Sequence, residues 1–426
     1  MVETSVNPFK KLLEATEVDT RILGMVAVLG LLWLGFGIAT DGAFLTPRNL
    51  WNLSVQTSSI AVMATGMVLV IVTRNIDLSV GSLLGFTGMI IAVTQAEWLP
   101  ALWGYDHSMT WALALLVGMV AGGLAGALQG FVIAYMGVPA FIVTLGGLLT
   151  WRGAAWWVTS GRTVAPMDST FQIMGGGPSG SVGELATWLI SGAICLMIVA
   201  VFLRGRHLRR LHRFPVRPVW AEFVLAGFYC AGVMGAAAIA NAYPWPYRIA
   251  ERYAQAEGIP VPEGGLEIAH GFAVPVLIAV FVAVVMSFIA TRTRFGRYVF
   301  AIGGNPEAAE LAGVNTRKVI LLVFTLMGIL AAIGAAISTA RLNAATNALG
   351  TLDELYVIAA AVIGGTSLAG GVGKIAGAIL GALVMQSLQS GMVLVGIDTP
   401  LQNMIVGVVL VIAVWVDTLY RKRSSL

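Results

Sequence analysis

Gly373 and Lys374 are the residues that come closest to nucleotide chemistry in this sequence. A phosphate-binding loop needs an earlier glycine, then Gly-Lys and a hydroxyl residue, because backbone amides, the ammonium group and the hydroxyl hold the phosphates and their metal ion. Leu368 stands where the first glycine should be, and Ile375 stands where the hydroxyl should be. We therefore interpret this stretch as a glycine-rich turn, and we expect no ATP hydrolysis by the chain itself.

Other catalytic or ion-binding patterns do not occur either. The sequence contains neither H-E-x-x-H nor G-x-S-x-G, and its four histidines lie in segments between apolar stretches. Cys195 and Cys230 both lie inside apolar runs, and two cysteines are too few for a disulfide scaffold or a Cys-rich metal site. We expect no catalytic residue, no bound metal and no cofactor.

The composition excludes a water-soluble protein. Charged residues make up 11% of the 426 residues, and hydrophobic residues make up 58%. Soluble domains contain about 25% charged residues, so this chain has too few charges to cover a surface in water. A soluble enzyme and a nucleic-acid-binding module are therefore excluded, and the net charge of +4 fits basic cytoplasmic loops.

The apolar runs predict the fold class. A helix that spans a bilayer needs about 20 apolar residues, and the first such run begins at Ile22 without a small-residue cleavage site, so we expect a retained span. The sequence predicts an all-α, polytopic membrane protein with about 12 transmembrane helices. We place these helices at residues 22–39, 52–73, 80–98, 111–135, 140–158, 185–203, 219–241, 271–291, 319–340, 353–370, 375–393 and 401–419.

The basic residues predict the orientation. Lys and Arg collect on the cytoplasmic side of membrane proteins. If the N-terminus is inside, most of them lie in inner segments, including the arginine-rich cluster from Arg204 to Arg217. We therefore expect both termini to be cytoplasmic.

Glycines recur every fourth residue in two of the predicted helices. Small residues at this spacing allow helix backbones to approach closely. Packing within one subunit is one interpretation. The other is an interface between subunits, or a contact along which helices move relative to each other. The residues are Gly118, Gly122, Gly126 and Gly130 in one helix, and Gly373, Gly377 and Gly381 in the other.

The predicted helices contain almost no ionisable residues. Arg152 lies beside tryptophans that are typical of a membrane interface, and Asp353 and Glu354 lie near the end of a predicted helix. Carriers driven by protons or sodium usually need buried carboxylates or histidines, although backbone carbonyls can also hold sodium. The pattern favours an uncharged solute and an external source of energy.

The predicted cytoplasmic loop 292–318 contains a short helix of its own. Asn305 is a good N-cap, Pro306 is a good first helical residue, and Glu307 lies near the positive end of the helix dipole. Gly313 ends the helix, which we expect to have about two turns and to lie at the cytoplasmic face. It is either a docking element or a surface helix that only closes a long loop.

Four motifs together carry a resemblance to a known family. Glu307-Ala308-Ala309 with Gly313 matches the E-A-A-x-x-x-G coupling motif of ATP-binding cassette (ABC) importer permeases. Residues 73–82 resemble the T-x-x-I-D-L-S-V-G-S hallmark of the ribose-type monosaccharide branch. Two more stretches of that branch are matched by Gly296-Arg297-Tyr298 with Gly303-Gly304-Asn305, and by residues 364–371.

The chain departs from the ribose-type pattern at residues 204–270, which add about two helices to a ten-helix importer-like core. An enlarged permease of this branch resembles the xylose type, a likeness that rests on length and insertion. The apolar runs and this resemblance together predict a cytoplasmic segment 1–21, helices 1–6 in 22–203, an inserted region 204–270, helices 8–12 in 271–420 with the coupling loop 292–318, and a cytoplasmic tail 421–426.

The resemblance implies the permease subunit of an ATP-driven importer of a neutral monosaccharide, D-xylose or a related pentose, in the bacterial inner membrane. The expected partners are a second copy of the chain, a cytoplasmic ATP-binding subunit and a periplasmic sugar-binding protein that docks on outer loops such as 159–184. Other sugars, namely ribose, galactose or arabinose, a secondary carrier, and a membrane scaffold or sensor are the alternatives. The residues expected to contact the ATPase are Gly304, Asn305, Pro306, Glu307, Ala308, Ala309, Leu311 and Gly313.

Four polar residues are candidates for the translocation path or its gate. Gln129, Asn343 and Gln386 offer the hydrogen-bonding groups that sugars need, although Gln386 also suits a buried helix–helix contact. Asp77 can cap the following helix, or it can act at a gate or a dimer contact.

Overall fold

The computed structural model describes residues 16, 17, 20–261 and 266–424. These residues form helices and no strands, apart from three isolated bridges, so the predicted all-α class is confirmed. Most of the predicted segment 1–21 and the last two residues of the predicted tail lie outside the described residues. The chain divides into two compact units, residues 1–27 with 181–273 and residues 28–180 with 274–426.

The first unit is built on two long helices, α9 (Gly183–Leu211) and α10 (Val219–Asn241), which pack against each other. Arg206 and Glu222 form a half-buried ion pair at 2.7 Å, which joins the end of α9 to the start of α10. Cys195 and Cys230 are free thiols on these two helices. A short helix, α11 (Tyr247–Glu257), follows in the segment after α10.

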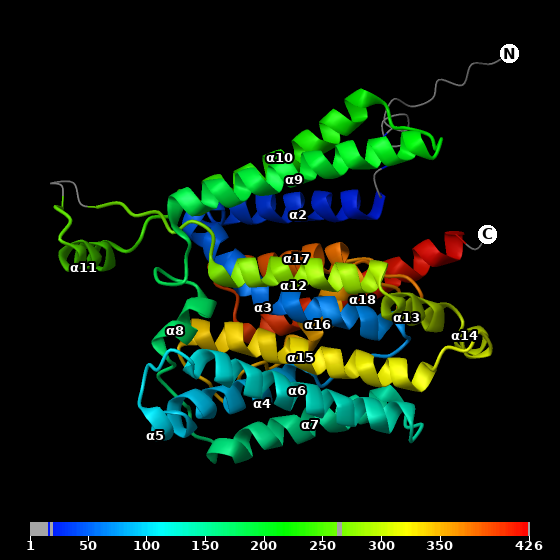
Figure 1. Ribbon diagram of the computed structural model, residues 1–426, viewed down its shortest axis with the longest axis horizontal. Coiled ribbons are helices and arrows are strands. Elements are labelled where there is room, and N and C mark those ends of the chain that lie inside the picture. Colours follow the sequence, from blue (N-terminus) through cyan, green and yellow to red (C-terminus); the bar gives the residue numbers. More distant parts are fainter. Residues whose placement is uncertain (1–15, 18–19, 262–265, 425–426) are drawn as a thin grey trace. The chain divides into compact units, whose positions relative to one another are not determined.

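The second unit contains the remaining helices, and its core lies along α3, α15 and α16 (Figure 1). The helix α2 (Thr20–Ala39) crosses the boundary between the units. The other helices are η1 (Ala43–Leu45), α3 (Pro47–Val72), α4 (Val80–Val93), the π-helical turn η2 (Thr94–Trp98), α5 (Pro100–Trp103), α6 (Thr110–Ala134), α7 (Ala140–Thr159), α8 (Ser169–Gln172), η3 (Ile173–Gly175), α12 (Val274–Arg292), α13 (Arg294–Gly304), α14 (Pro306–Leu311), α15 (Thr316–Leu342), α16 (Asp353–Ile363), α17 (Ile375–Leu394) and α18 (Thr399–Ser424).

Both glycine series pack helices within one subunit. A β-carbon at Gly122 or Gly126 would meet the backbone carbonyl of Gly328 or Phe324 on α15, so α6 and α15 lie backbone to backbone. A β-carbon at Gly377 or Gly381 on α17 would likewise meet the backbone carbonyl of Gly364 or Ala360. The interpretation of packing within one subunit is confirmed for these residues.

Nine helices among the described residues are long and apolar enough to cross a membrane. They match nine of the predicted spans. Of the other three, α7 has the predicted length but is less apolar, and α18 has a shorter apolar part, Thr399–Trp415. The third, predicted at 353–370, is helical only in α16, which at about 16 Å is far shorter than a bilayer core of about 30 Å.

The early end of α16 has a local cause. Gly364 follows Ile363, and Gly365, Gly370 and Gly371 all have positive φ angles, between 74° and 87°. Glycine adopts this conformation without a steric cost, whereas helix propagation needs negative φ throughout. Counting apolar residues did not detect this glycine loop, so the predicted span was too long.

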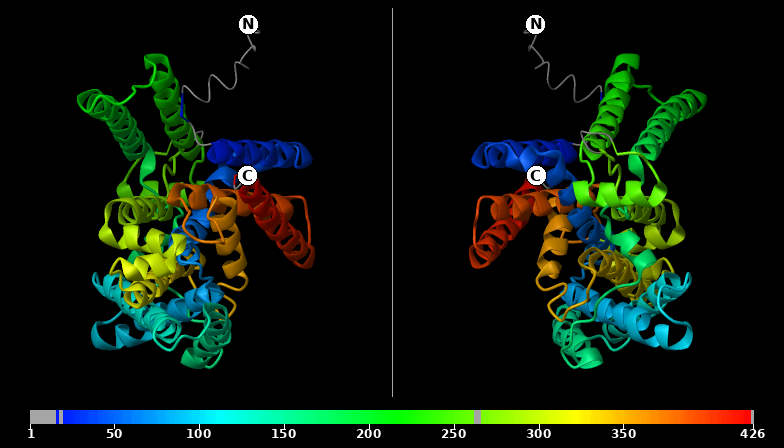
Figure 2. Two further views of the ribbon diagram at one scale, coloured as in Figure 1. Left: turned by 90° about the vertical axis from the view of Figure 1, so that its right-hand side faces the viewer. Right: turned by 90° about the vertical axis from the view of Figure 1, so that its left-hand side faces the viewer.

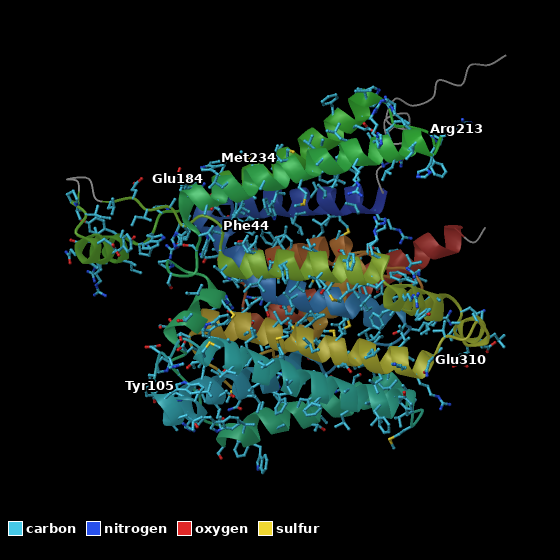
Figure 3. All side chains as sticks on the ribbon, in the orientation of Figure 1. Phe44, Tyr105, Glu184, Arg213, Met234 and Glu310 are labelled. Atoms are coloured by element: carbon cyan, nitrogen blue, oxygen red, sulfur yellow. The ribbon has the colours of Figure 1, made fainter. Side chains whose placement is uncertain are left out.

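Two loops that are predicted to lie on opposite sides of the membrane are found at opposite ends of the second unit. Figure 3 shows Glu310, which belongs to α14, at one end and Tyr105, which follows α5, at the other. Figure 1 shows α6, α12 and α15 extending between these two ends, and Figure 2 gives the views from either end. The predicted cytoplasmic loop 292–318 is therefore separated by the length of the bundle from the segment between the predicted helices 80–98 and 111–135.

Candidate functional site

The helix α14 is built by local signals that the sequence predicts. The Asn305 side chain accepts a hydrogen bond from the Ala308 amide at 3.1 Å, which caps the helix, and Pro306 occupies its first turn. Gly313 has φ of +83°, and its amide donates to the Glu310 carbonyl at 2.9 Å. The helix has six residues, slightly fewer than the predicted two turns.

The two faces of α14 differ sharply. Ala309 is buried at 5% exposure, whereas Leu311 is 91% exposed. Glu310 is held by the hydroxyl of Thr316 at the start of α15, while Glu307 is exposed in the first turn. Glu310 is also exposed, so the helix presents the apolar side chain of Leu311 and two acidic residues to the outside, a combination that suits a docking surface.

Arg74, which follows α3, forms hydrogen bonds to the segment before α14. Its Nε donates to the Gly303 carbonyl at 2.8 Å, and its Nη2 donates to the Gly304 carbonyl at 2.7 Å. These carbonyls end α13, where helices leave carbonyl groups without partners and favour a nearby cation. Arg74 holds a positive φ of 63°, so the chain turns sharply after α3 at this residue.

Glycines allow three chain segments to meet beside Arg74. The Gly371 amide donates to the Val72 carbonyl at 3.0 Å. A β-carbon at Gly303 would meet both of these groups, and one at Gly370 would meet the Arg74 side chain. The stretches 73–82, 303–305 and 364–371, which are separate motifs in the sequence, therefore form one junction next to α14.

Asp77 and Gln129 are brought together by Ser79. The Asp77 carboxylate, 1% exposed, accepts hydrogen bonds from the Ser79 amide at 2.8 Å and from its hydroxyl at 2.6 Å. Gln129 Nε2 donates to the same hydroxyl at 2.9 Å. Burial raises the pKa of the Asp77 carboxyl, and the bonds from Ser79 oppose this rise.

Asp77 lies at the start of α4 without capping its first turn directly. Its hydrogen bonds go to Ser79, the N-cap residue, and no side chain caps the amides of the helix itself. The Thr144 hydroxyl donates to the Ile76 carbonyl at 3.2 Å, so α7 also contacts this turn. The arrangement fixes the loop between α3 and α4.

Asn343 and Gln386 lie in two other places. Asn343 ends α15 with φ of +51°, and its Oδ1 accepts a hydrogen bond from the Met167 amide at 2.8 Å. Gln386 lies on α17, and its Nε2 donates to Gln56 and Gln389, both at 3.0 Å. The four predicted path residues thus form one pair and two separate sites.

Arg152 has surroundings that its sequence position does not predict. Its Nη1 donates to the carbonyls of Asn347 and Leu349, at 3.0 and 2.7 Å. Glu354 is buried at 7% exposure, and it packs against Gly81 on α4. Neither residue is a simple interfacial group, and the sequence holds no signal for these contacts because the partners lie far along the chain.

The chain is similar to a family of permeases and to several sugar transport proteins. A family model described as the permease component of a branched-chain amino acid transport system matches residues 49–414. The xylose transport system permease protein XylH of Haemophilus influenzae is 35% identical over 95% of this chain and 98% of its own length, and that of Escherichia coli is 37% identical over 95% and 94%. The ribose import permease protein RbsC of Escherichia coli is 33% identical over 88% of this chain and 87% of its own length. The search of solved structures gave no match.

Proposed function

The chain belongs to this permease family, in its ribose-type ABC branch, and from this membership we propose that it is the permease subunit of an ATP-driven xylose importer in the inner membrane. The observation that carries the proposal is identity of 35 and 37% over 95% of the chain to two xylose transport permeases. The ribose permease, at 33% over 88%, is a more distant relative. D-xylose is therefore the proposed substrate, before ribose, galactose or arabinose.

In this proposal α14 is the coupling helix. ATP hydrolysis belongs to a cytoplasmic partner subunit, and a groove of that subunit receives the exposed side of α14, including Glu307 and Leu311. The capped ends at Asn305 and Gly313 support this role, because a helix that carries force between subunits needs fixed ends. The proposed contact set is Gly304, Asn305, Pro306, Glu307, Ala308, Ala309, Leu311 and Gly313.

The proposed assembly has two copies of the chain, one for each ATPase subunit, with about 12 transmembrane helices each and both termini in the cytoplasm. A periplasmic sugar-binding protein delivers the sugar to outer loops such as 159–184. The compact unit formed by 181–273 with 1–27 supports the interpretation of 204–270 as an insertion. Of the four path candidates, Gln386 is the one whose neighbours are also amides.

Reconstitution tests this proposal. The chain is placed in liposomes alone, with a cognate ATPase, and with both the ATPase and a xylose-binding protein, and labelled pentoses and hexoses are supplied. We expect accumulation of xylose only with MgATP and all three components. Accumulation by the chain alone would identify a secondary carrier, and binding without flux would identify a scaffold or sensor.

A further inference from the structure

Polar side chains form two hydrogen-bonded groups, one after the other, between α3 and α17 in the second unit. Gln386 Nε2 donates to Gln56 Oε1 and Gln389 Oε1, and the Ser390 hydroxyl donates to Asn49 Oδ1 at 3.2 Å. We call Asn49, Gln56, Gln386, Gln389 and Ser390 the amide row. Figure 1 shows the two helices, which pack against each other.

The row runs from one end of the two helices over a little more than a third of their length. Asn49 is in the first turn of α3, and Ser390 is close to the end of α17. At 1.5 Å per residue, Gln56 lies about 14 Å and Gln386 about 12 Å from that end. With a bilayer core of about 30 Å, these two amides lie near the middle of the membrane. The charge distribution of the loops puts the near end of the row outside.

The side chains of the row are only partly buried by the rest of the subunit. Asn49, Gln56, Gln389 and Ser390 are all partly exposed, and only Gln386 is buried. Among the described residues, the Nε2 groups of Gln56 and Gln389 have no hydrogen-bond partner. Polar groups in this position rarely face lipid, since they have no partner there, and they face a watery path or another polar surface instead.

An aromatic ring borders the row. Trp33 on α2, half-buried, donates from Nε1 to the Ser387 hydroxyl at 3.0 Å, and Ser387 is the neighbour of Gln386. Carbohydrates are bound by amide donors and acceptors for their hydroxyls and by aromatic faces for their C–H surfaces. A row of neutral amides beside a tryptophan matches an uncharged, polyhydroxylated ligand.

We propose that the amide row, with Trp33, is the surface that a neutral sugar contacts between the outer face and the middle of the membrane. The free Nε2 donors of Gln56 and Gln389 are the groups that bind sugar hydroxyls. The inference rests on the proposed function as a sugar permease, and it extends that function by naming the substrate-contacting residues.

The first test measures access of water to the row. Gln56→Cys and Gln389→Cys are made in a Cys195→Ser, Cys230→Ser background and assembled with the ATPase in proteoliposomes. A hydrophilic methanethiosulfonate reagent should label both at least ~10-fold faster than Leu388→Cys, a matched control on α17 whose side chain packs against the core. Labelling of Gln389→Cys no faster than of Leu388→Cys, both without nucleotide and with MgATP and vanadate, would overturn the proposal. Oxidative joining of two copies at that cysteine without labelling would also overturn it, and would make the row a contact between copies.

The second test measures sugar contact. Gln56→Leu and Gln389→Leu should each reduce xylose uptake about 10-fold at a subsaturating concentration, the effect of one lost hydrogen bond to the substrate. Wild-type uptake by the double variant would contradict the proposal. If the wild-type complex carries no xylose but the cysteines are labelled, the row still lines a path and the proposed xylose function fails instead.

Discussion

The guanidinium of Arg74 binds the carbonyls of Gly303 and Gly304 at 2.8 and 2.7 Å. The arginine follows α3, the most deeply buried long helix of the second unit, and the carbonyls directly precede α14. Two charge-assisted hydrogen bonds, which are stronger than neutral ones, therefore connect the segment before α14 to the end of α3. In the proposed importer, this pair links the docking surface for the ATPase to the core of the permease.

Replacement of Arg74 by alanine should uncouple ATP hydrolysis from transport. The junction would lose both hydrogen bonds, at a cost of about 1–3 kcal/mol in stability, and the subunit should still insert. We expect more ATP hydrolysed for each sugar molecule carried, measured in proteoliposomes with the full complex. Arg74→Lys, which keeps the charge but has a single nitrogen in place of the guanidinium fork, should give an intermediate ratio. An unchanged ratio in Arg74→Ala would show that the junction does not transmit the motion.

Replacement of Leu311 should weaken assembly without affecting the fold. Its side chain is 91% exposed, so Leu311→Ser should change the stability of the isolated subunit by no more than about 0.5 kcal/mol. Affinity for the ATPase subunit should fall about 10-fold or more, as expected for an apolar anchor in a pocket. Binding measured by titration in detergent checks this. Wild-type affinity would place the ATPase contact elsewhere.

Replacement of Gly126 should destabilise the packing of α6 on α15. A β-carbon there would meet the Phe324 carbonyl, and backbone atoms cannot easily move aside. We expect Gly126→Ala to cost about 1–3 kcal/mol, the usual range for overpacking, and to lower the thermal unfolding midpoint in detergent. Gly146→Ala on α7 is the matched control, because nothing lies within 4 Å of its added β-carbon. Equal midpoints for the two variants would be inconsistent with this packing.

His270 should make the first unit sensitive to acid. The residue is 1% exposed, and its imidazole stacks on the Tyr243 ring with 4.3 Å between the ring centroids. Burial lowers the pKa of this imidazole below its ordinary value of 6.5. Below pH 6.5 the unfolded chain binds a proton that the folded chain does not, so stability is complete above pH 6.5 and is lost as pH falls through the folded pKa. Thermal unfolding between pH 8 and 5 should show this loss for the wild type and less of it for His270→Phe. Identical profiles would contradict the assignment.

Local features of the site could be predicted from the sequence, and long-range ones could not. Asn305, Pro306 and Gly313 fixed the limits of α14, because caps and left-handed glycines act through hydrogen bonds to residues a few positions away. The bond from Arg74 to Gly303 joins residues 229 positions apart. Nothing in either residue type specifies such a partner, so only the folded chain reveals the junction.

The helices show the same division. Run length predicted α15 and α17 closely, since burial in lipid or core depends on apolar residues that can be counted. It overestimated α16, whose apolar sequence continues into glycines with positive φ. It also gave no sign that Gln56 lies opposite Gln386, because the pairing of α3 with α17 is set by tertiary packing.

The most direct test of α14 as the coupling helix is a variant that combines Glu307→Lys with Gly313→Val. The first change reverses the exposed charge, and the second puts a branched side chain at φ of +83°, a conformation that costs about 1–2 kcal/mol outside glycine. Xylose uptake and sugar-stimulated ATP hydrolysis are measured together in proteoliposomes, after size exclusion has confirmed assembly of the complex. We predict that both rates fall together. Wild-type uptake by the assembled variant would contradict the assignment of α14 to coupling.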